Sequence, residues 1–474
     1  MTETIKFGTD GWRAIIGGEF TFANVRRVAG AMARYVITQG TASQGLVIGY
    51  DARFLSPQSA REAAELASQS GVPVLLAEGI TPTPALSYAV AVRKAAGGIM
   101  ITASHNPCQW NGIKFKAPYG GSAAPPIVQE IEKLLPPPGN NVKPAGLLPP
   151  ARVQMGDLVD PYLARIKTMV NLSRIRASGM KFAIDPMYGA ARGLITRIFE
   201  EAAIPVTEIH SEHNPLFPGL NPEPIEPHVA DLRHAVLEGG YSAGLATDGD
   251  ADRIGAVDRS GMFVDSHKIF CILLSHLAGD MGKRGEVVRT FSTTTMVDKI
   301  ARKYNLPLHV TPIGFKYVCE LMLKRDVLIG GEESGGIGIQ GHLPERDGIL
   351  NSLLLAEVMA EKGRTLGELV QELNGEYGPH YYGRVDIEIG RTAIDRTLRL
   401  VGDRKITSVA GRAVRGVEDL DGLKMVFGDS IWLLVRASGT ENMLRLYAEA
   451  PSPEEVKKML DEMADVAKDS PPAA

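Results

Sequence analysis

The feature that most restricts the fold of this chain is an alternation of short apolar runs with longer amphipathic stretches. Residues 46–51 and 72–76 are apolar runs of strand length, and the helix-like stretches 56–69 and 84–93 follow them. This strand–helix–strand–helix order predicts a parallel sheet covered by helices. The same rhythm begins again at 181–185 and a third time near 287, so we expect three similar α/β units.

Three interruptions of this rhythm mark the expected boundaries. They are a proline-rich passage at 136–150, a turn at 258–261 and the region 374–378, which opens with an Asn-Gly pair typical of a turn. Beyond the last one, residues 385–389 alternate between apolar and charged side chains, as a sheet with one exposed face does. We therefore expect three α/β units with parallel or mixed sheets and a smaller C-terminal α+β unit, with the bounds 1–152, 153–262, 263–376 and 377–474.

A serine with unusual neighbours follows one of the expected strands. Residues 97–101 are apolar, and Thr102-Ala103-Ser104-His105-Asn106-Pro107 comes directly after them. Open α/β sheets bind their ligands at the carboxyl ends of strands, and Asn-Pro makes the chain turn there. Ser104 and His105 are therefore candidate reactive groups, although an isolated pair of this kind also occurs in ordinary turns.

Three carboxylates at alternate positions, Asp248, Asp250 and Asp252, lie between two apolar runs. Clustered carboxylate oxygens are the ligands that Mg²⁺ or Ca²⁺ prefers. An EF-hand is excluded by the spacing, because its sixth and twelfth positions would be Arg253 and Arg259 instead of Gly and Glu. The alternative is a solvated acidic turn, since Asp-Gly pairs are common in turns.

Two further loops carry side chains suited to a sugar phosphate. Arg436-Ala437-Ser438-Gly439-Thr440-Glu441-Asn442 joins a guanidinium to small hydroxyl residues around a glycine, and Arg445 follows. Such a loop can hold a phosphate dianion. Gly330-Gly331-Glu332-Glu333-Ser334-Gly335-Gly336 offers carboxylates that accept hydrogen bonds from sugar hydroxyls. Each loop alone is also compatible with a plain hydrated turn.

Together these loops resemble the α-D-phosphohexomutase family over essentially the whole chain. The family pattern opens with a phosphate-contacting stretch, matched by Phe7-Gly8-Thr9-Asp10-Gly11-Trp12-Arg13. Its phosphoserine, metal, sugar and phosphate loops are matched in order by 102–107, 248–253, 331–335 and 436–442. The resemblance implies four domains. Because each loop falls in a different unit, we expect the active site in a central cleft among them.

The resemblance also implies a mechanism that starts from a phosphoserine at Ser104. Ser104 would hold Mg²⁺ together with Asp248, Asp250 and Asp252, and the metal would neutralise charge as the phosphoryl group moves. A hexose phosphate would become a bound hexose 1,6-bisphosphate, which is also the expected activator, and would return its other phosphate after turning over. The implied contacts are Glu332, Ser334 and Arg253 to the sugar, and Arg436, Ser438, Gly439, Thr440 and Arg445 to the phosphate.

Proton transfer requires an acid and a base near the reacting hydroxyl. Arg13 and Lys114 match family positions near the phosphoryl group, where cations offset negative charge, and His105 would orient the phosphoserine. By resemblance, Lys114 and Lys316 are the candidates for acid or base. His342, in Gly341-His342-Leu343-Pro344, is a further candidate at the sugar, although a lone loop histidine is more often a surface residue.

The sugar loop favours the phosphoglucomutase branch of the family. Glu333 and Gly336 stand where phosphomannomutase-type members more often carry Met and His. We therefore expect interconversion of hexose 1-phosphate and hexose 6-phosphate, with glucose preferred. A phosphomannomutase, a dual glucose and mannose enzyme and a phosphoglucosamine mutase remain open, because the branches share the serine and metal loops.

Two other classes compete with a mutase. A metal-dependent sugar phosphatase could use the same serine and aspartates, but it would need no second phosphate loop. A non-catalytic sugar-phosphate sensor is expected to lack the serine or a metal carboxylate, and this chain has all of them.

The composition restricts partners and location. A net charge of −4 without runs of Lys and Arg argues against nucleic acid, and the apolar runs are too short to span a bilayer. The N-terminal residues lack the pattern of a signal peptide. Cys108, Cys271 and Cys319 have no metal-ligand spacing and are interpreted as reduced thiols. We expect a cytoplasmic monomer or homodimer that acts on small sugar phosphates.

Overall fold

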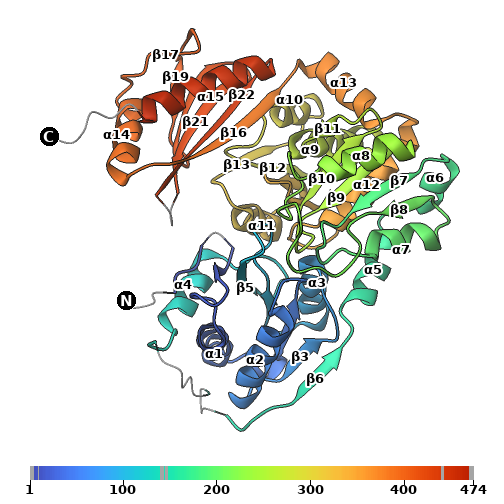
Figure 1. The fold of residues 1–474 in the computed structure, drawn as a ribbon, viewed down its shortest axis with the longest axis vertical. Coiled ribbons are helices and arrows are strands. Elements are labelled where there is room, and N and C mark those ends of the chain that lie inside the picture. The colour runs from blue at the N-terminus through green and yellow to red at the C-terminus, as the bar shows by residue number, and fades with distance from the viewer. Residues whose placement is uncertain (1–4, 9, 139–143, 145–147, 439–441, 469–474) are drawn as a thin grey trace.

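The structure is a computed structural model that describes the chain except for residues 1–4, 9, 139–143, 145–147, 439–441 and 469–474. It contains three units in which helices cover a sheet and a fourth with an antiparallel sheet (Figure 1). The first unit lies at the lower end of Figure 1 and the fourth at the upper left. The expected class, three α/β units with parallel or mixed sheets and a smaller C-terminal unit, is confirmed.

The first sheet has the order β1-β5-β4-β2-β3-β6, in which β5 alone runs antiparallel to its neighbours. Its apolar strands are packed between helices, as the sequence rhythm predicts. The strands are β1 (Trp12–Ile15), β2 (Leu46–Tyr50), β3 (Val74–Ala77), β4 (Gly97–Ile101), β5 (Trp110–Lys116) and β6 (Val153–Gly156). The helices are α1 (Phe22–Thr38), η1 (Ala42–Gln44), α2 (Ser56–Gln69), α3 (Thr83–Arg93) and α4 (Pro125–Lys133).

The second sheet has the order β11-β10-β9-β7-β8, with β7 parallel to β8 and β9, and β10 antiparallel to β9 and β11. The acidic loop, residues 248–253 with Asp248, Asp250 and Asp252, connects β9 to β10. The strands are β7 (Phe182–Asp185), β8 (Val206–Glu208), β9 (Ala243–Thr247), β10 (Ile254–Asp258) and β11 (Phe263–Val264). The helices are α5 (Val159–Lys167), α6 (Leu172–Ala177), α7 (Leu194–Glu201) and α8 (Ala230–Gly239).

The third sheet has the order β13-β12-β14-β15, and only β15 is antiparallel. The sugar loop connects β14 to β15. The strands are β12 (Glu286–Thr290), β13 (Leu308–Thr311), β14 (Val327–Gly331) and β15 (Ile337–Ile339). The helices are α9 (Ser266–Ser275), η2 (His276–Asp280), α10 (Met296–Lys303), α11 (Phe315–Lys324), α12 (Gly348–Lys362) and α13 (Leu366–Tyr377).

The fourth unit has an antiparallel sheet of order β16-β22-β21-β20-β19 with α15 packed on β16 and β22. The phosphate loop lies between β21 and β22. The strands are β16 (Tyr381–Glu388), β17 (Ser408–Val409), β18 (Arg412–Ala413), β19 (Gly416–Glu418), β20 (Leu423–Gly428), β21 (Ile431–Ala437) and β22 (Met443–Ala450). The helices are α14 (Arg391–Gly402) and α15 (Pro453–Lys468).

The sheets extend past two of the expected boundaries. β6 adds a strand beside β3 after residue 152, and β11 pairs with β10 after residue 262. Both strands are short, so no clear period marks them in the sequence.

The turn predicted at Asn374-Gly375 is wrong, because both residues lie inside α13. A capping box between Thr365 and Glu368 starts this helix, and a buried stripe that ends at Leu373 holds it against the core. Gly375 faces open space, where its cost in a helix is only about 1 kcal/mol. Tertiary packing therefore overrides the local turn signal.

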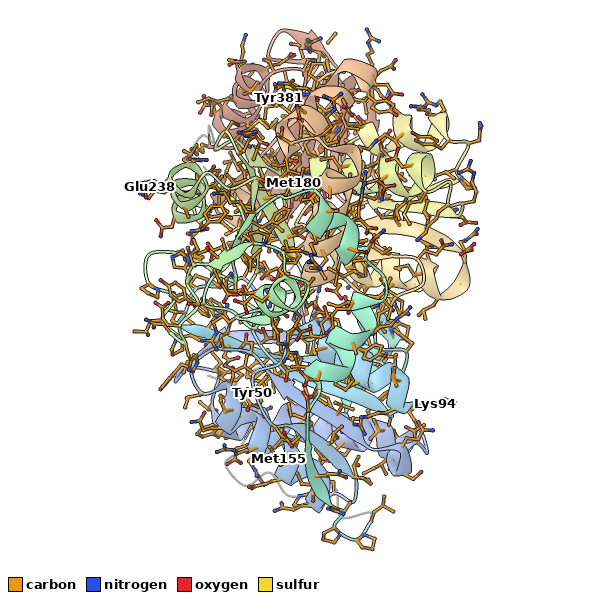
Figure 2. All side chains as sticks on the ribbon, turned by 90° about the vertical axis from the view of Figure 1, so that its right-hand side faces the viewer. Tyr50, Lys94, Met155, Met180, Glu238 and Tyr381 are labelled. Carbon is orange, nitrogen blue, oxygen red and sulfur yellow. The ribbon has the colours of Figure 1, made fainter. Side chains whose placement is uncertain are left out.

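The second and third units share one hydrophobic core, whereas the fourth has a core of its own. A small apolar cluster at the seam joins Phe291 of the third unit to Trp432, Leu434 and Tyr447 of the fourth. Figure 2 places Tyr381, where β16 begins, toward the opposite end of the molecule from Met155 of β6. Within the described part of the chain, the helices are all too short or too polar to cross a membrane.

Candidate active site

Ser104 lies just beyond the end of β4 in a strained backbone conformation. Its φ is +54°, and the residue is 1% exposed. A left-handed residue other than glycine costs roughly 1–2 kcal/mol, so surrounding bonds must hold it in place. The Ser104 amide donates to Thr102 Oγ1 at 2.8 Å, and Ser104 Oγ donates to Asp248 Oδ2 at 2.9 Å.

Arg53, which the sequence analysis did not single out, holds the serine loop from behind. Its guanidinium donates to the carbonyl oxygens of Ser104 at 2.6 Å, Asn106 at 2.5 Å, Pro107 at 2.9 Å and Trp110 at 3.0 Å. Arg53 is 1% exposed and follows β2. Planar, charged donors of this kind give strong and directional hydrogen bonds. Arg53 therefore fixes the turn that presents the serine hydroxyl.

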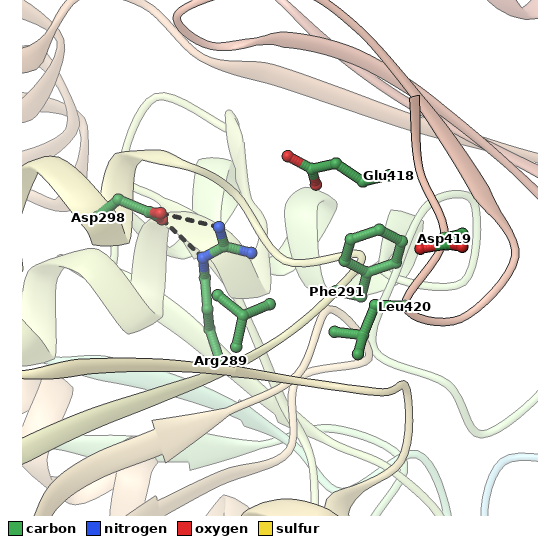
Figure 3. A pocket seen from close by; sticks show the side chains of 7 residues that line it. Arg289, Phe291, Asp298, Glu418, Asp419 and Leu420 are labelled. Atoms are coloured by element: carbon green, nitrogen blue, oxygen red, sulfur yellow. Dashed lines mark hydrogen bonds and ion pairs between the residues drawn. The ribbon is translucent and has the colours of Figure 1, made fainter. Parts of the chain in front are cut away.

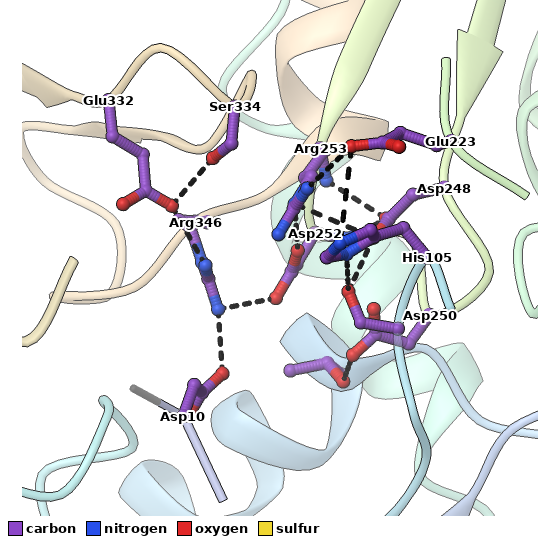
Figure 4. Close-up of polar contacts among 12 residues, drawn as sticks. Asp10, His105, Glu223, Asp248, Asp250, Asp252, Arg253, Glu332, Ser334 and Arg346 are labelled. Atoms are coloured by element: carbon purple, nitrogen blue, oxygen red, sulfur yellow. Dashed lines mark hydrogen bonds and ion pairs between the residues drawn. The ribbon is translucent and has the colours of Figure 1, made fainter. Parts of the chain in front are cut away.

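The three aspartates of the acidic loop converge in the interior. Asp248, Asp250 and Asp252 each offer a carboxylate oxygen within 4.8 Å of the others, and all three are 0% exposed (Figure 4). Asp248 Oδ1 accepts from the amides of Asp252 at 2.9 Å and Arg253 at 3.1 Å, which closes the loop on itself. A Cβ atom at Gly249 would overlap the Ser104 carbonyl oxygen, so glycine allows the serine loop to approach this closely.

This group has the properties of a site for a hard divalent cation. Asp250 Oδ1 and Asp252 Oδ1 are buried and accept no hydrogen bond within the described residues. Burial, and the neighbouring charges of Asp250 and Asp252, raise the pKa of Asp248 well above its usual value. Buried carboxylates with unused oxygens fit a cation with oxygen ligands, and the Ser104 hydroxyl lies beside them.

Lys114 on β5 supplies positive charge to the same group. Its Nζ lies 2.8 Å from Asp250 Oδ2, 3.1 Å from Asp10 and 3.5 Å from Asp252. Burial alone would lower the pKa of Lys114, but these carboxylates outweigh it and raise the pKa. Asp250 Oδ2 also accepts from Thr83 Oγ1 at the start of α3, at 2.5 Å. Lys114 therefore remains an ammonium group.

The imidazole of His105, which was expected beside the serine, lies among arginine side chains. His105 Nδ1 lies 3.4 Å from Ser104 Oγ. Burial, and the charges of Arg253 and Arg13, hold the pKa of His105 well below its usual value, so the ring is neutral at neutral pH. Arg13 donates to Asn106 Oδ1 at 2.7 Å, and Arg253 Nε lies 3.8 Å from Asp248 Oδ2.

The sugar loop joins this group through a second arginine that the sequence analysis left without a role. Glu332 Oε1 accepts from Ser334 Oγ at 2.8 Å and from Arg346 Nη1 at 2.9 Å (Figure 4). Arg346 Nη2 also lies 2.8 Å from Asp10 Oδ2 and 2.7 Å from Asp252 Oδ2. Arg346 therefore links the sugar loop to the first and second units.

Two residues of the sugar region point elsewhere. Glu333 Oε2 accepts from Ser292 Oγ at 2.6 Å. His342 is not brought to the site, because its side chain is 2% exposed and its Nε2 lies 2.9 Å from Asp347 Oδ2. Tyr162 donates to the same carboxylate at 2.7 Å, so this histidine belongs to an interior contact between α5 and the third unit.

The phosphate loop forms a separate group. Arg436, at the end of β21, donates from Nε to Asp421 Oδ1 at 2.8 Å, and Asp421 Oδ2 accepts from the Ile313 amide of the third unit at 2.9 Å. Ser438 is 6% exposed, and Arg445 Nε lies 3.8 Å from Asp386. Gly439 and Thr440 lie outside the described residues.

Lys316, at the start of α11, interacts electrostatically with residues of both groups. Burial lowers its pKa, Asp10 of the buried group and Asp421 of the fourth unit raise it, and Arg436 lowers it further. The net shift is downward, which makes Lys316 a readier proton acceptor than Lys114.

A pocket of about 520 Å³ lies at the seam of the third and fourth units (Figure 3). Arg289, in a bidentate pair with Asp298, lines it together with Phe291, Val310, Glu418, Asp419 and Leu420. Among the described residues, those that line this pocket include none of the predicted site residues.

Sequence signals for the two arginines existed but were weak. Arg53 comes three residues after the strand that ends at Tyr50, where a polar residue is expected to face the carboxyl edge of the sheet. Arg346 stands in Glu345-Arg346-Asp347, directly before α12. Neither position shows by itself which distant carbonyl or carboxylate it meets.

Comparison with known proteins agrees with this arrangement. Family models of phosphoglucomutase/phosphomannomutase match as α/β/α domain I at residues 4–137, domain II at 160–261, domain III at 265–377 and the C-terminal domain at 398–466. A phosphoglucomutase/phosphomannomutase of Thermococcus kodakarensis is 30% identical over 96% of both chains. A phosphoglucosamine mutase of Carboxydothermus hydrogenoformans is 31% identical over 97% of this chain and 98% of its own.

Solved structures show the same likeness. A structure from Thermus thermophilus, described as a phosphomannomutase, has a TM-score of 0.87 at 36% identity and covers 99% of this chain and 100% of its own. A phosphoglucomutase from Paramecium, in an open form, shares the fold with a TM-score of 0.82 at 21% identity, covering 100% of this chain and 98% of its own. The chain therefore belongs to the phosphoglucomutase/phosphomannomutase family of phosphohexomutases.

Proposed function

We propose that this enzyme interconverts the 1-phosphate and the 6-phosphate of a hexose, with glucose preferred, through a phosphorylated Ser104 and a hexose 1,6-bisphosphate. One observation carries the proposal: Ser104 Oγ, held at a left-handed residue, donates to Asp248 among three buried carboxylates. A hydroxyl in this position is suited to carry a phosphoryl group whose charge the site offsets.

Asp248, Asp250, Asp252 and the phosphorylated Ser104 would hold Mg²⁺. When bound, the metal would offset negative charge on the phosphoryl group. The chain's own residues supply the rest. Lys114 keeps a positive charge beside Asp250, and the cations of Arg13 and Arg253 lie near the neutral imidazole of His105. These cations favour a phosphoryl group on the serine.

We assign the proton transfers to Lys316 and Lys114 in different roles. The lowered pKa of Lys316 suits a group that takes a proton from the attacking sugar hydroxyl. The raised pKa of Lys114 suits a permanent cation or proton donor. His105, neutral and 3.4 Å from Ser104 Oγ, would orient the phosphoserine.

The fourth unit would grip the phosphate that is not reacting. Arg436, Ser438, Gly439, Thr440 and Arg445 are the proposed ligands, while Glu332, Ser334 and Arg253 would bind sugar hydroxyls in both orientations of the bisphosphate. His342 is left out of this set, because its imidazole is bonded to Asp347.

The preference for glucose rests on Glu333 and Gly336, which depart from the phosphomannomutase-type pattern. The relatives support two further candidates. The Thermococcus protein carries both glucose and mannose names, and the Carboxydothermus protein is named for glucosamine. A mannose, dual or glucosamine enzyme would use the same serine and metal residues.

A substrate panel tests the proposal. The enzyme would be assayed with Mg²⁺ and a trace of hexose 1,6-bisphosphate on the 1-phosphates of glucose, mannose and glucosamine. We expect the highest kcat/KM with glucose 1-phosphate. A higher value with mannose or glucosamine would overturn the glucose preference and leave the mutase reaction in place. Release of inorganic phosphate without isomerisation would instead identify a phosphatase.

A further inference from the structure

Arg346 is buried among carboxylates from three units. It is 5% exposed, and its guanidinium meets Asp10 of the first unit, Asp252 of the second and Glu332 of the third at 2.7–2.9 Å. The ring of Phe315 lies under it, 5.5 Å from the guanidinium carbon. A planar cation with this many partners has one favourable orientation.

The shape of the sugar loop depends on this side chain. A Cβ atom at Gly336 would overlap Arg346 Cδ, lie 2.7 Å from Arg346 Cγ and lie 3.1 Å from Glu332 Oε1. The φ of Gly336 lies outside the left-handed region, so space and not backbone conformation requires glycine there. The stem of Arg346 therefore occupies the volume that a side chain at position 336 would take.

This arrangement fixes the orientation of Glu332. Its Oε1 accepts from both Arg346 Nη1 and Ser334 Oγ, so the carboxylate cannot rotate freely. Glu332 Oε2 accepts no hydrogen bond from the described residues, which leaves it for a ligand hydroxyl.

Building on the proposed function, we propose that Arg346 is the positioning residue that aims Glu332 at the sugar, and that Gly336 and Arg346 act as one unit in hexose selection. A side chain at 336 displaces Arg346, and loss of Arg346 releases Glu332. Arg346 itself performs no proton or phosphoryl transfer.

Binding in the absence of turnover tests this directly. In a Ser104→Ala parent, calorimetry would measure Kd for the 6-phosphates of glucose, mannose and glucosamine, with and without EDTA. We expect Arg346→Ala to weaken the preferred ligand by about 10- to 100-fold, the range of charge-assisted hydrogen bonds, and to reduce its advantage over the other two. Arg346→Lys should recover part of both. The EDTA arm separates this effect from one that acts through the metal ligand Asp252.

A double-mutant cycle separates positioning from general destabilisation. Gly336→Ala should weaken binding nearly as much as Arg346→Ala, and the double variant should lose little more than either single one. Gly375→Ala, in open space on α13, and Arg325→Ala, on an exposed arginine, are the matched controls and should bind like the parent. Melting temperatures would be measured for every variant.

The outcomes are distinct. Losses that add in the double variant, or unchanged Kd and selectivity in both single variants, would overturn the role of Arg346 while the mutase function stands. A parent that binds none of the three hexose phosphates would overturn the proposed function itself.

Discussion

The group around Ser104 and the phosphate loop of the fourth unit are built in opposite ways. Around Ser104, buried ion pairs join three units, and the single side chain of Arg346 contacts a carboxylate from each of them. In the fourth unit, Arg436 pairs with Asp421 of the turn between β19 and β20, and the Arg436 side chain is 20% exposed. Ser104 therefore lies in a network of buried ion pairs, whereas the phosphate loop lies at a partly solvated edge.

The hydrophobic cores repeat this contrast. The second and third units share one core, and the fourth meets the third through a small seam cluster at Phe291. Interfaces of limited apolar area permit relative motion of domains. This difference fits the proposed mechanism, in which the geometry around Ser104 stays constant while the phosphate loop releases and rebinds a phosphate as the bisphosphate turns over.

The largest expected effect is in the buried group around Ser104. Ser104→Ala should lower kcat by more than about 1,000-fold, because removing a nucleophile abolishes the covalent route. A coupled assay of glucose 6-phosphate formation would measure it. Ser87→Ala, at a buried serine of α3 outside the site, is the control and should keep its activity. A Ser104→Ala enzyme with near-normal kcat would contradict the assignment of Ser104 as the nucleophile, and with it the contrast between the two regions.

The next effect concerns how the serine is held. Arg53→Lys keeps the charge but loses most of the bonds to the four carbonyl oxygens, so we expect kcat to fall by about 10- to 100-fold with a smaller change in KM. Guanidinium ions added to Arg53→Gly should restore part of the activity. Equal losses in kcat and in the melting temperature without rescue would argue for a purely structural role.

In the phosphate loop of the fourth unit, the expected change is in KM. Arg436→Ala should raise KM for the hexose phosphate by about 10-fold and lower kcat less, because it removes a charge-assisted contact to the phosphate that is not reacting. Steady-state kinetics with Arg415→Ala as a control in the same unit would measure this. A loss confined to kcat would contradict the assignment of Arg436 to a non-reacting phosphate.

The seam should respond to pH through Lys424 of β20. Burial, together with the neighbouring charge of Arg289, lowers the pKa of Lys424 from its usual 10.5 to about 7. Between pH 7 and pH 10.5, Lys424 is protonated in the unfolded chain and neutral in the folded one. The free energy of unfolding should therefore rise with pH, by up to about 1.4 kcal/mol per pH unit.

Chemical denaturation of wild type and Lys424→Met at pH 7 and pH 9 would test this sign. The wild type should gain stability relative to Lys424→Met as the pH rises. Lys457→Met, on the exposed face of α15, should show no such difference. A wild type whose stability relative to Lys424→Met does not change over this range would show that the lysine stays protonated in the folded state, held by its contacts with the Phe291 carbonyl and the rings of Phe291 and Trp432.

The smallest expected effect is a movement of the fourth unit. Saturating hexose 1,6-bisphosphate should reduce the radius of gyration slightly as the phosphate loop closes on its ligand. Small-angle scattering with and without the ligand would detect it, and the Arg436→Ala variant should change less. Identical profiles for the wild type would mean that both regions are equally fixed.

Much of this architecture follows from local sequence. The strands near 46, 97 and 243 and the helices α2 and α3 come from periodicity, and the loops after β4, β9 and β14 come from polar residues at strand ends. Arg53 and Arg346 were missed because their roles depend on partners elsewhere in the chain, up to 336 residues away. The short strand β11 and the helix through Asn374 were missed because tertiary pairing and packing decide them.

His342 shows the same limit in the opposite direction, because the sequence placed it at the site and the structure does not. Its loop position and titratable ring suggested a ligand contact. In the structure its imidazole bonds instead to Asp347, at the start of α12, and Tyr162 of α5 donates to the same carboxylate. Sequence alone cannot show that a distant helix covers a loop.

The most direct test of the account is the phosphorylation of Ser104 itself. Enzyme treated with hexose 1,6-bisphosphate and Mg²⁺ would be examined by intact-mass and peptide mass spectrometry, and then treated with excess hexose 6-phosphate. We predict one added phosphoryl group, located on Ser104, that the second treatment removes. A wild type that turns over its substrate without ever carrying a phosphoryl group on Ser104, or that carries it on another residue, would contradict the account.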